Sequence, residues 1–215
     1  MTTVTVTDYI TMTEFRDYIG SDSGIGNKQA VAELAISTAS REIDAFCGRN
    51  FFQQDLTLYF SPEQNNLWIL DFGDNDLATT SGLTVHVEFG IDGTYPEVRT
   101  FGTDFICEPI NQSVNGIGGW PFTYLRAING KIWPQRYIDY YRDTVKIVGT
   151  FGWPAVPDPV KQATKIIAAQ RYKMSDAPLG YNAINGWGEV RVKDIPLVAS
   201  ILQPYQKANT KFLIA

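Results

Sequence analysis

The sequence predicts an α+β protein in which a helical core of about four helices is interrupted by a large β-rich insertion. Apolar residues recur at helical spacing near both ends of the 215-residue chain, whereas the alternation typical of strands fills its middle. We therefore expect residues 1–52 and 153–215 to form the helical core and residues 53–152 to form the insertion. A hydrophobic content of 44% is enough to bury a core without disulfides or a structural metal.

Two helices are expected before the insertion. Thr11 can cap the first helix while Glu14, three residues later, bonds back to it, and Gly20 should end this helix. A longer helix should start at Asn27, and Gly48 just beyond its end should act as the C-terminal cap. The small and apolar residues of this second helix recur near helical spacing, so another helix can approach it closely.

The insertion should contain roughly five to seven strands. The clearest strand patterns lie at residues 56–60, 67–70, 83–89 and 144–148. The pair Asp92-Gly93 is typical of a turn between strands, and the glycine-bearing segment 111–119 is expected to be a loop.

The helical pattern returns after the insertion. Asp158 followed by Pro159 is a good start signal for a helix that should extend toward Met174. The last helix should run from about residue 195 to Tyr205, with Pro204 kinking or ending it. With the two helices before the insertion, these segments make up the expected helical core.

The overall charge argues against sequence-specific nucleic-acid binding. The net charge is -5, the isoelectric point is near 4.9, and no dense cationic cluster is present. Duplex binders, by contrast, depend on Lys and Arg side chains at phosphates. No apolar run approaches membrane-spanning length, and the polar, Thr-rich start carries no secretion signal, so we expect a protein made in a reducing cytoplasm.

The candidate chemical motifs are better explained by structure. The tripeptide DFG at residues 71–73 matches the magnesium-binding motif of protein kinases, but no glycine-rich phosphate loop or catalytic-loop motif accompanies it. The single histidine, His86, and the two cysteines, Cys47 and Cys107, cannot complete a metal set or a catalytic triad. The sequence therefore predicts no catalytic, metal or cofactor site, although a hydrolase using loop carboxylates stays as an alternative.

Three Trp-Pro pairs begin at Trp120, Trp133 and Trp153. Proline removes a donor from the strand ladder and tryptophan supplies a large apolar surface, so these pairs can mark strand ends packed by indole rings. The same residues can also form an aromatic face for a partner. The sequence leaves both interpretations open.

Several short blocks of the sequence resemble the head–tail connector, or adaptor, proteins of tailed bacteriophages, which lie beneath the portal. The blocks are YIT at 9–11 with EFRDYIG at 14–20, AS at 39–40 with ID at 43–44, CGRNFF at 47–52, VGTFGWPAVP at 148–157 with VKQA at 160–163, and ILQPY at 201–205. The run at 149–157 is the most specific. The blocks span the chain but are separated by the segment 56–149, where small adaptors have little or nothing.

The resemblance implies a structural subunit rather than an enzyme. Such subunits form a homo-oligomeric ring, commonly of about twelve copies, between the portal protein and another neck protein or the tail-terminator protein. DNA passes through the channel without specific binding, and an acidic lumen would let it slide. The protein would then belong to the neck of the virion and be assembled in the host cytoplasm.

The resemblance also suggests where contacts lie, because the last helix and tail of such proteins are expected to meet the portal. The residues expected to dock there are Ile201, Leu202, Tyr205, Phe212, Leu213 and Ile214, and those expected at ring or neighbour contacts are Trp120, Trp133 and Trp153. The alternative function is a phage decoration protein or a receptor- or carbohydrate-binding module. Rings seen by electron microscopy would favour the connector, whereas a glycan-induced shift in melting temperature would favour the binding module.

Overall fold

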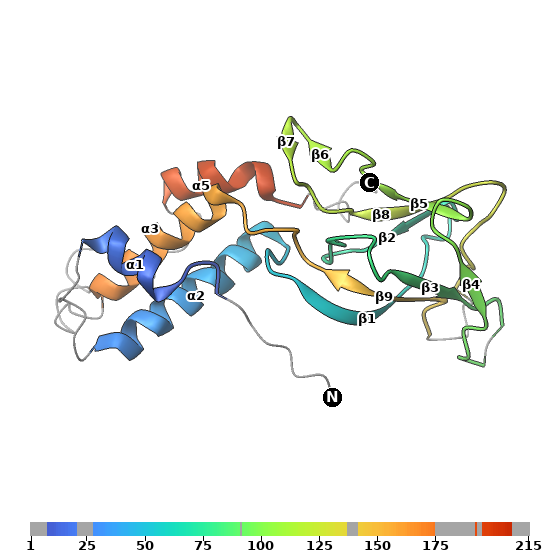
Figure 1. The fold of residues 1–215 in the computed structure, drawn as a ribbon, viewed down its shortest axis with the longest axis horizontal. Helices are drawn as coiled ribbons and strands as arrows, with labels where there is room; N and C mark the ends of the chain where they lie inside the picture. Colours follow the sequence, from blue (N-terminus) through green and yellow to red (C-terminus); the bar gives the residue numbers. More distant parts are fainter. Residues whose placement is uncertain are drawn as a thin grey trace. The chain divides into compact units, whose positions relative to one another are not determined.

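The computed structural model describes residues 8–20, 28–90, 92–136, 142–174, 192 and 195–207. The chain divides into two compact units, Met1–Phe51 with Val156–Ala215, and Phe52–Ala155. The first unit is helical and the second is β-rich (Figure 1). The predicted α+β class, with a helical part and a β-rich part, is therefore confirmed.

Four α-helices make up the described part of the helical unit. They are α1 (Met12–Ile19), α2 (Gln29–Cys47), α3 (Asp158–Met174) and α5 (Pro196–Leu202), and the 3-10 turn η3 (Gln203–Tyr205) follows the last of them. Helix α2 packs along α3, and α1 and α5 also pack on α3. The helical segments before and after the insertion thus form one unit, as we expect from their small-residue faces. No helix among the described residues is both long and apolar enough to cross a membrane.

Helices α2 and α3, which pack on each other, both bury small side chains. Ala32, Ala35 and Ala39 of α2 are buried, as are Ala163 and Ala168 of α3. Short side chains at a helix contact allow the two helix axes to approach closely. The alanine-rich spacing of the sequence therefore has a packing role.

The predicted helix caps are largely confirmed. The Thr11 hydroxyl accepts from the Glu14 amide at 3.1 Å, and the Glu14 carboxylate accepts from the Thr11 amide at 2.7 Å. Gly20 and Gly48 end α1 and α2 in the left-handed region, with φ of 68° and 65°. Helix α2 begins at Gln29, and its expected cap, Asn27, lies outside the described residues.

The C-terminal helix ends where its proline predicts. Helix α5 stops at Leu202, and Pro204 lies within the 3-10 turn that follows. A proline at this point removes the amide that a continuing α-helix would need.

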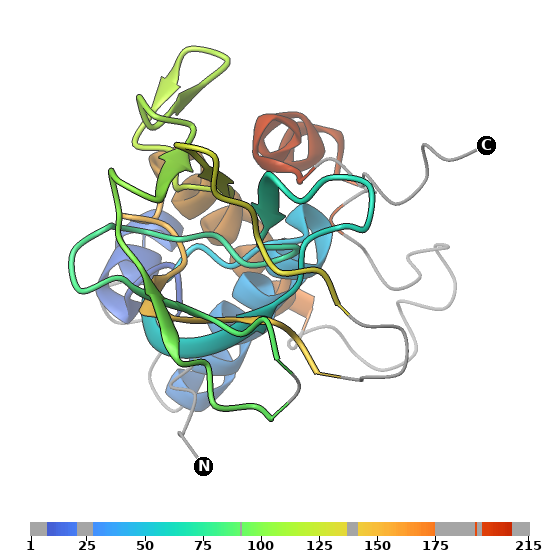
Figure 2. The ribbon, with the colours of Figure 1, turned by 90° about the vertical axis from the view of Figure 1, so that its right-hand side faces the viewer.

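The β-rich unit contains two antiparallel sheets and a small hairpin. The first sheet has the strand order β1 (Gln54–Phe60), β9 (Val145–Phe151), β3 (Thr84–Val87), β4 (Glu97–Arg99). The second has the order β2 (Ile69–Asp71), β8 (Tyr124–Ala127), β5 (Phe105–Glu108), and the hairpin pairs β6 (Ser113–Val114) with β7 (Ile117–Gly118). Figure 2 shows this hairpin extending away from the rest of the unit.

Two expectations about the insertion were wrong. The described residues contain nine strands rather than five to seven, because several short strands of two to four residues carry too little alternation to be recognised. The segment 111–119, expected to be a loop, forms the hairpin of β6 and β7 around Asn115 and Gly116, both of which have positive φ. An Asn-Gly pair at these two positions is typical of a tight hairpin turn.

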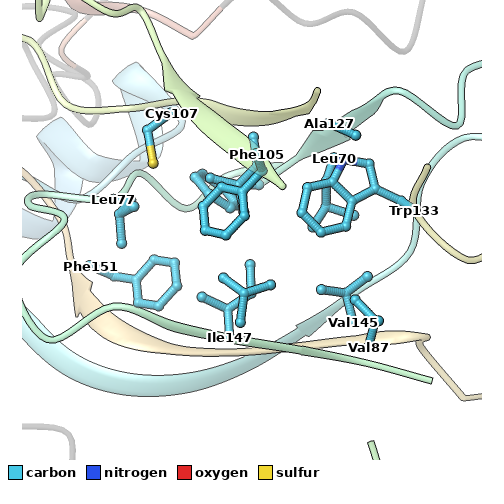
Figure 3. Packing of buried hydrophobic residues seen from close by; sticks show 13 residues of the cluster. Leu70, Leu77, Val87, Phe105, Cys107, Ala127, Trp133, Val145, Ile147 and Phe151 are labelled. Carbon is cyan, nitrogen blue, oxygen red and sulfur yellow. The ribbon is translucent and has the colours of Figure 1, made fainter. Parts of the chain in front are cut away.

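One apolar core holds the two sheets of the β-rich unit together. Its buried members are Leu70, Phe72, Leu77, Val85, Val87, Phe105, Cys107, Leu125, Ala127, Trp133, Val145, Ile147 and Phe151. Figure 3 shows Phe105 and Trp133 on one side of this core, facing Val145 and Ile147 on the other. Alternate residues of β9 enter the core, so the period-2 pattern of its sequence reports a real sheet face.

Gly152 permits a close backbone approach, and Gly152→Ala should destabilise the β-rich unit. Its φ is +109°, and an added Cβ would lie 1.8 Å from the carbonyl oxygen of Phe52. Because that neighbour is backbone and cannot rotate away, we expect a loss of roughly 2–4 kcal/mol in the free energy of unfolding, measured by denaturant titration.

Gly130→Ala is the matched control. Gly130 has φ +72°, but a Cβ there would meet no atom within 4 Å. The Gly130→Ala variant should lose only about 1 kcal/mol in the free energy of unfolding, because alanine is strained in the left-handed conformation. Equal losses in the two variants would show that the contact with Phe52 is unimportant.

Candidate interaction surfaces

The three Trp-Pro tryptophans are buried within the β-rich unit. The Trp153 indole nitrogen donates to the buried Asp76 carboxylate at 3.3 Å, and the Trp120 ring packs edge-on against the Trp153 ring at a centroid distance of 4.8 Å. Trp133 belongs to the core cluster. Their predicted role in ring contacts stays a prediction, and their burial in the single chain does not favour it.

The predicted docking residues divide into three groups. Leu202 and Tyr205 are buried in the helical unit, and the Tyr205 ring packs against Phe51 at 6.1 Å. Ile201 is partly exposed. The remaining three, Phe212, Leu213 and Ile214, lie outside the described residues.

Leu197 is an exposed apolar residue of α5 that the sequence analysis missed. Its side chain is 60% exposed, and it precedes the partly exposed Ile201 by one helical turn. Residues four apart lie on the same side of a helix, so these two form one apolar strip. The spacing of four in the sequence was the available signal, but only Ile201 of the two was among the residues expected at the portal contact.

A hollow of about 380 Å³ lies in the β-rich unit, lined by Tyr59, Gly93, Tyr95, Arg142 and Asp143. The two tyrosine rings are 5.5 Å apart, and the Tyr95 hydroxyl donates to the Asp143 carbonyl at 2.6 Å. The Arg142 guanidinium lies 2.0 Å from the place where a Cβ on Gly93 would be, so this glycine makes room for the cation. Burial raises the pKa of Tyr95, with the negative charge of a nearby glutamate adding to the effect.

The residues considered for chemistry lie in ordinary structural positions. Asp71 of the DFG tripeptide accepts from the Gly73 amide at 2.7 Å in a turn after β2. Burial raises the pKa of both Cys47 and Cys107 to about 12, so their thiols stay protonated and are poor nucleophiles. His86 is half-buried on β3, opposite Lys146 of β9. The described part of the chain holds no group of three His, Cys, Asp or Glu residues that could hold a metal ion.

A buried polar network joins three of the blocks on which the connector resemblance rests. The Tyr9 amide donates to the Ser40 hydroxyl at 3.2 Å. The Tyr9 hydroxyl donates to the Asp44 carboxylate and accepts from the Phe51 amide at 3.0 Å. Burial raises the pKa of Asp44 to about 6, against the opposing effects of the Tyr9 hydrogen bond and Arg41. These polar residues therefore hold the start of the helical unit to α2.

Asp44→Asn should change the pH dependence of stability. The folded carboxyl binds its proton more tightly than an unfolded one with a pKa of 3.8, so this group favours folding at low pH and the benefit is lost as pH rises from about 4 to about 6. The loss should be about 1–2 kcal/mol after discounting for solvent screening. In urea titrations, the free energy of unfolding of the variant should rise by that amount relative to the natural chain between pH 4 and pH 7. If the difference between the two chains were the same at both pH values, the prediction would be wrong.

Comparison with known proteins gives similarity in structure alone. No protein-family model matches the chain, and no curated protein matches its sequence. A chain from the neck of the empty GTA particle, computed with C6 symmetry, matches with a TM-score of 0.56 and 14% identity, over 94% of this chain and 91% of that one. A chain from the neck of the native GTA particle, computed with C12 symmetry, matches with a TM-score of 0.51 and 14% identity, over 95% and 96%.

The chain shares the fold of these neck proteins. The resemblance to connector proteins predicted from the sequence is thereby confirmed at the level of the fold. Because each match covers more than nine tenths of both chains, the β-rich unit must be included in it. The long insertion sets this chain apart from small adaptors, but it does not set it apart from these neck proteins.

Proposed function

We propose that the chain is a structural subunit of a phage-type virion neck, where it forms a ring between portal and tail around a channel for DNA. The observation that carries this proposal is the match over nearly the whole chain to two neck chains, one computed with C6 and one with C12 symmetry. The connector blocks in the sequence support it independently. Assembly would take place in the host cytoplasm, and the finished protein would belong to the virion.

Ring closure requires two different surfaces on each copy. In a cyclic ring each subunit presents one face to the copy before it and another to the copy after it. Twelve copies is the number we propose, in keeping with the C12 symmetry of one matching neck. The net charge of -5 suits a channel through which DNA slides, because attraction to phosphates would retard it.

The surface that docks on the portal is proposed to lie on α5 and the segment after it. Leu197 and Ile201 supply an apolar strip that the single chain leaves at least partly uncovered. Phe212, Leu213 and Ile214 would extend this strip. Leu202 and Tyr205, also expected there from the sequence, are used for packing inside the helical unit.

Electron microscopy of the purified chain, alone and with purified portal protein, tests the proposal. We expect closed rings, alone or on the portal, with a central channel and a mass that gives the copy number. A chain that stays monomeric at high concentration and ignores the portal would refute the connector function.

A second candidate function is ligand binding by the β-rich unit. The hollow beside Tyr59 and Tyr95 combines aromatic rings with the Arg142 cation, and such groups can stack on sugar rings and bond their hydroxyls. Titration with soluble bacterial surface oligosaccharides tests this candidate. A rise in melting temperature that is lost in Tyr59→Ala would favour a binding module, and no rise would count against it.

A further inference from the structure

We propose that strand β1 receives an extended segment, residues 3–7, from a neighbouring copy of the chain, which adds a fifth strand to the first sheet. This inference rests on the proposed ring, since it needs a second copy beside the first. The two edges of the four-stranded sheet, β1 and β4, differ in length and in protection.

The edge at β4 is short and charged, whereas the edge at β1 is long. Strand β4 has three residues and carries Glu97 and Arg99. Strand β1 has seven residues, QDLTLYF, with no Lys, Pro or Gly, and pairs with β9 alone among the described strands. Its one charged residue, Asp55, accepts from the Thr150 hydroxyl of β9 at 2.6 Å. Proteins usually protect an exposed edge by shortness, charge or proline, and an unprotected edge is a template for another strand.

The core side of β1 is also incompletely covered. Leu56, Leu58 and Phe60 pack against the core cluster but stay only partly buried. By contrast, Ile147 and Val145 of β9, which pair with Leu58 and Phe60, are fully buried. Asp55, Thr57 and Tyr59 alternate with them on the exposed side. An added strand would therefore need apolar residues on one side and polar, β-branched residues on the other.

The sequence of residues 3–7, TVTVT, has this pattern. Val4 and Val6 would lie beside the half-covered apolar residues of β1, and the three threonines would lie on the side of Thr57. Threonine and valine are among the best strand formers, and cross-strand Thr–Thr pairs stabilise a sheet. Main-chain hydrogen bonds would supply the affinity and the alternating side chains the register.

The neighbouring copy is favoured as the donor by the demands of a ring. The segment 3–7 and the edge of β1 are two different parts of one chain, and a heterologous contact joins two different surfaces. Each copy would give one segment and receive another, so every edge in a closed ring would be filled.

Cysteine cross-linking between two separately made single variants tests the proposal. Thr5→Cys chains are mixed with Asp55→Cys, Thr57→Cys or Tyr59→Cys chains, rings are isolated, and mild oxidant is added. Facing residues on paired strands come close enough for a disulfide. We expect a mixed dimer on a non-reducing gel with at least one of the three partners, because their alternation covers the registers of this face.

Two further variants sharpen the result. Val6→Cys mixed with Thr57→Cys should cross-link roughly tenfold less, because neighbouring residues of a strand point to opposite faces. Adding Val4→Asp and Val6→Asp to the Thr5→Cys chain should also lower the yield roughly tenfold or more, because burial of two valines is lost.

The outcomes separate this inference from the connector function. Rings without any mixed dimer overturn the strand exchange and leave the connector intact. Cross-links that form only inside one chain, in a Thr5→Cys, Thr57→Cys double variant, also overturn it. If neither rings nor mixed dimers form, both proposals fail.

Discussion

A chain that lacks residues 210–215 should fold normally yet lose attachment to portal-bearing heads. The deletion removes Phe212, Leu213 and Ile214, and burial of one such side chain stabilises a contact by roughly 1.5–3 kcal/mol. Because the copies of a ring act together, the apparent affinity for the portal should fall by at least about a thousandfold. Binding is measured by co-sedimentation with purified portal or with DNA-filled heads, and the fold is checked by circular dichroism and melting temperature.

Two companion variants make this result specific. Lys211→Ser keeps the apolar residues and should attach normally. Leu197→Asp, at the exposed position on α5, should weaken attachment without changing the melting temperature. A well-folded truncation that binds the portal as tightly as the full chain would refute the docking role and leave the segment with local packing only.

Trp153→Ala should cause the largest loss of stability among single substitutions in the β-rich unit. The side chain is 1% exposed, packs on Trp120 and donates to the buried Asp76. Removing a buried tryptophan leaves a cavity and typically costs about 3–5 kcal/mol. Denaturant unfolding, followed by tryptophan fluorescence, measures this loss.

Trp68→Ala is the control, because the Trp68 side chain is 50% exposed. The Trp68→Ala variant should lose less than about 1 kcal/mol in the free energy of unfolding. If Trp153→Ala were as mild as this control while ring formation failed, the indole would act at a subunit contact and the packing interpretation would be wrong.

Local signals predicted the helices well. The Thr11 and Glu14 capping box, the glycines that end α1 and α2, and the proline after α5 all act over a few residues. Such interactions depend on the backbone geometry of one turn, so they can be recognised without knowing the rest of the fold. Long, alternating strands such as β1 and β9 were recognisable for the same reason.

Short strands and surface exposure were not predictable in this way. Strands of two to four residues, such as β5 and β8, exist because a neighbouring strand supplies their hydrogen bonds. Likewise, Leu202 and Leu197 are equally apolar in the sequence, but only Leu202 is buried. The tryptophan of each Trp-Pro pair could equally have been on the surface or in the core.

The sequence by itself determined the order of helical and β-rich segments, the caps that bound the helices, and the connector resemblance, because these depend on neighbouring residues and their spacing. Only the tertiary structure decided which apolar residues are buried and which strand forms the long, partly buried edge of the first sheet. Burial depends on residues far apart in the chain, as when Leu58 of β1 meets Ile147 of β9. The sequence pattern around either residue does not predict that these two residues pair.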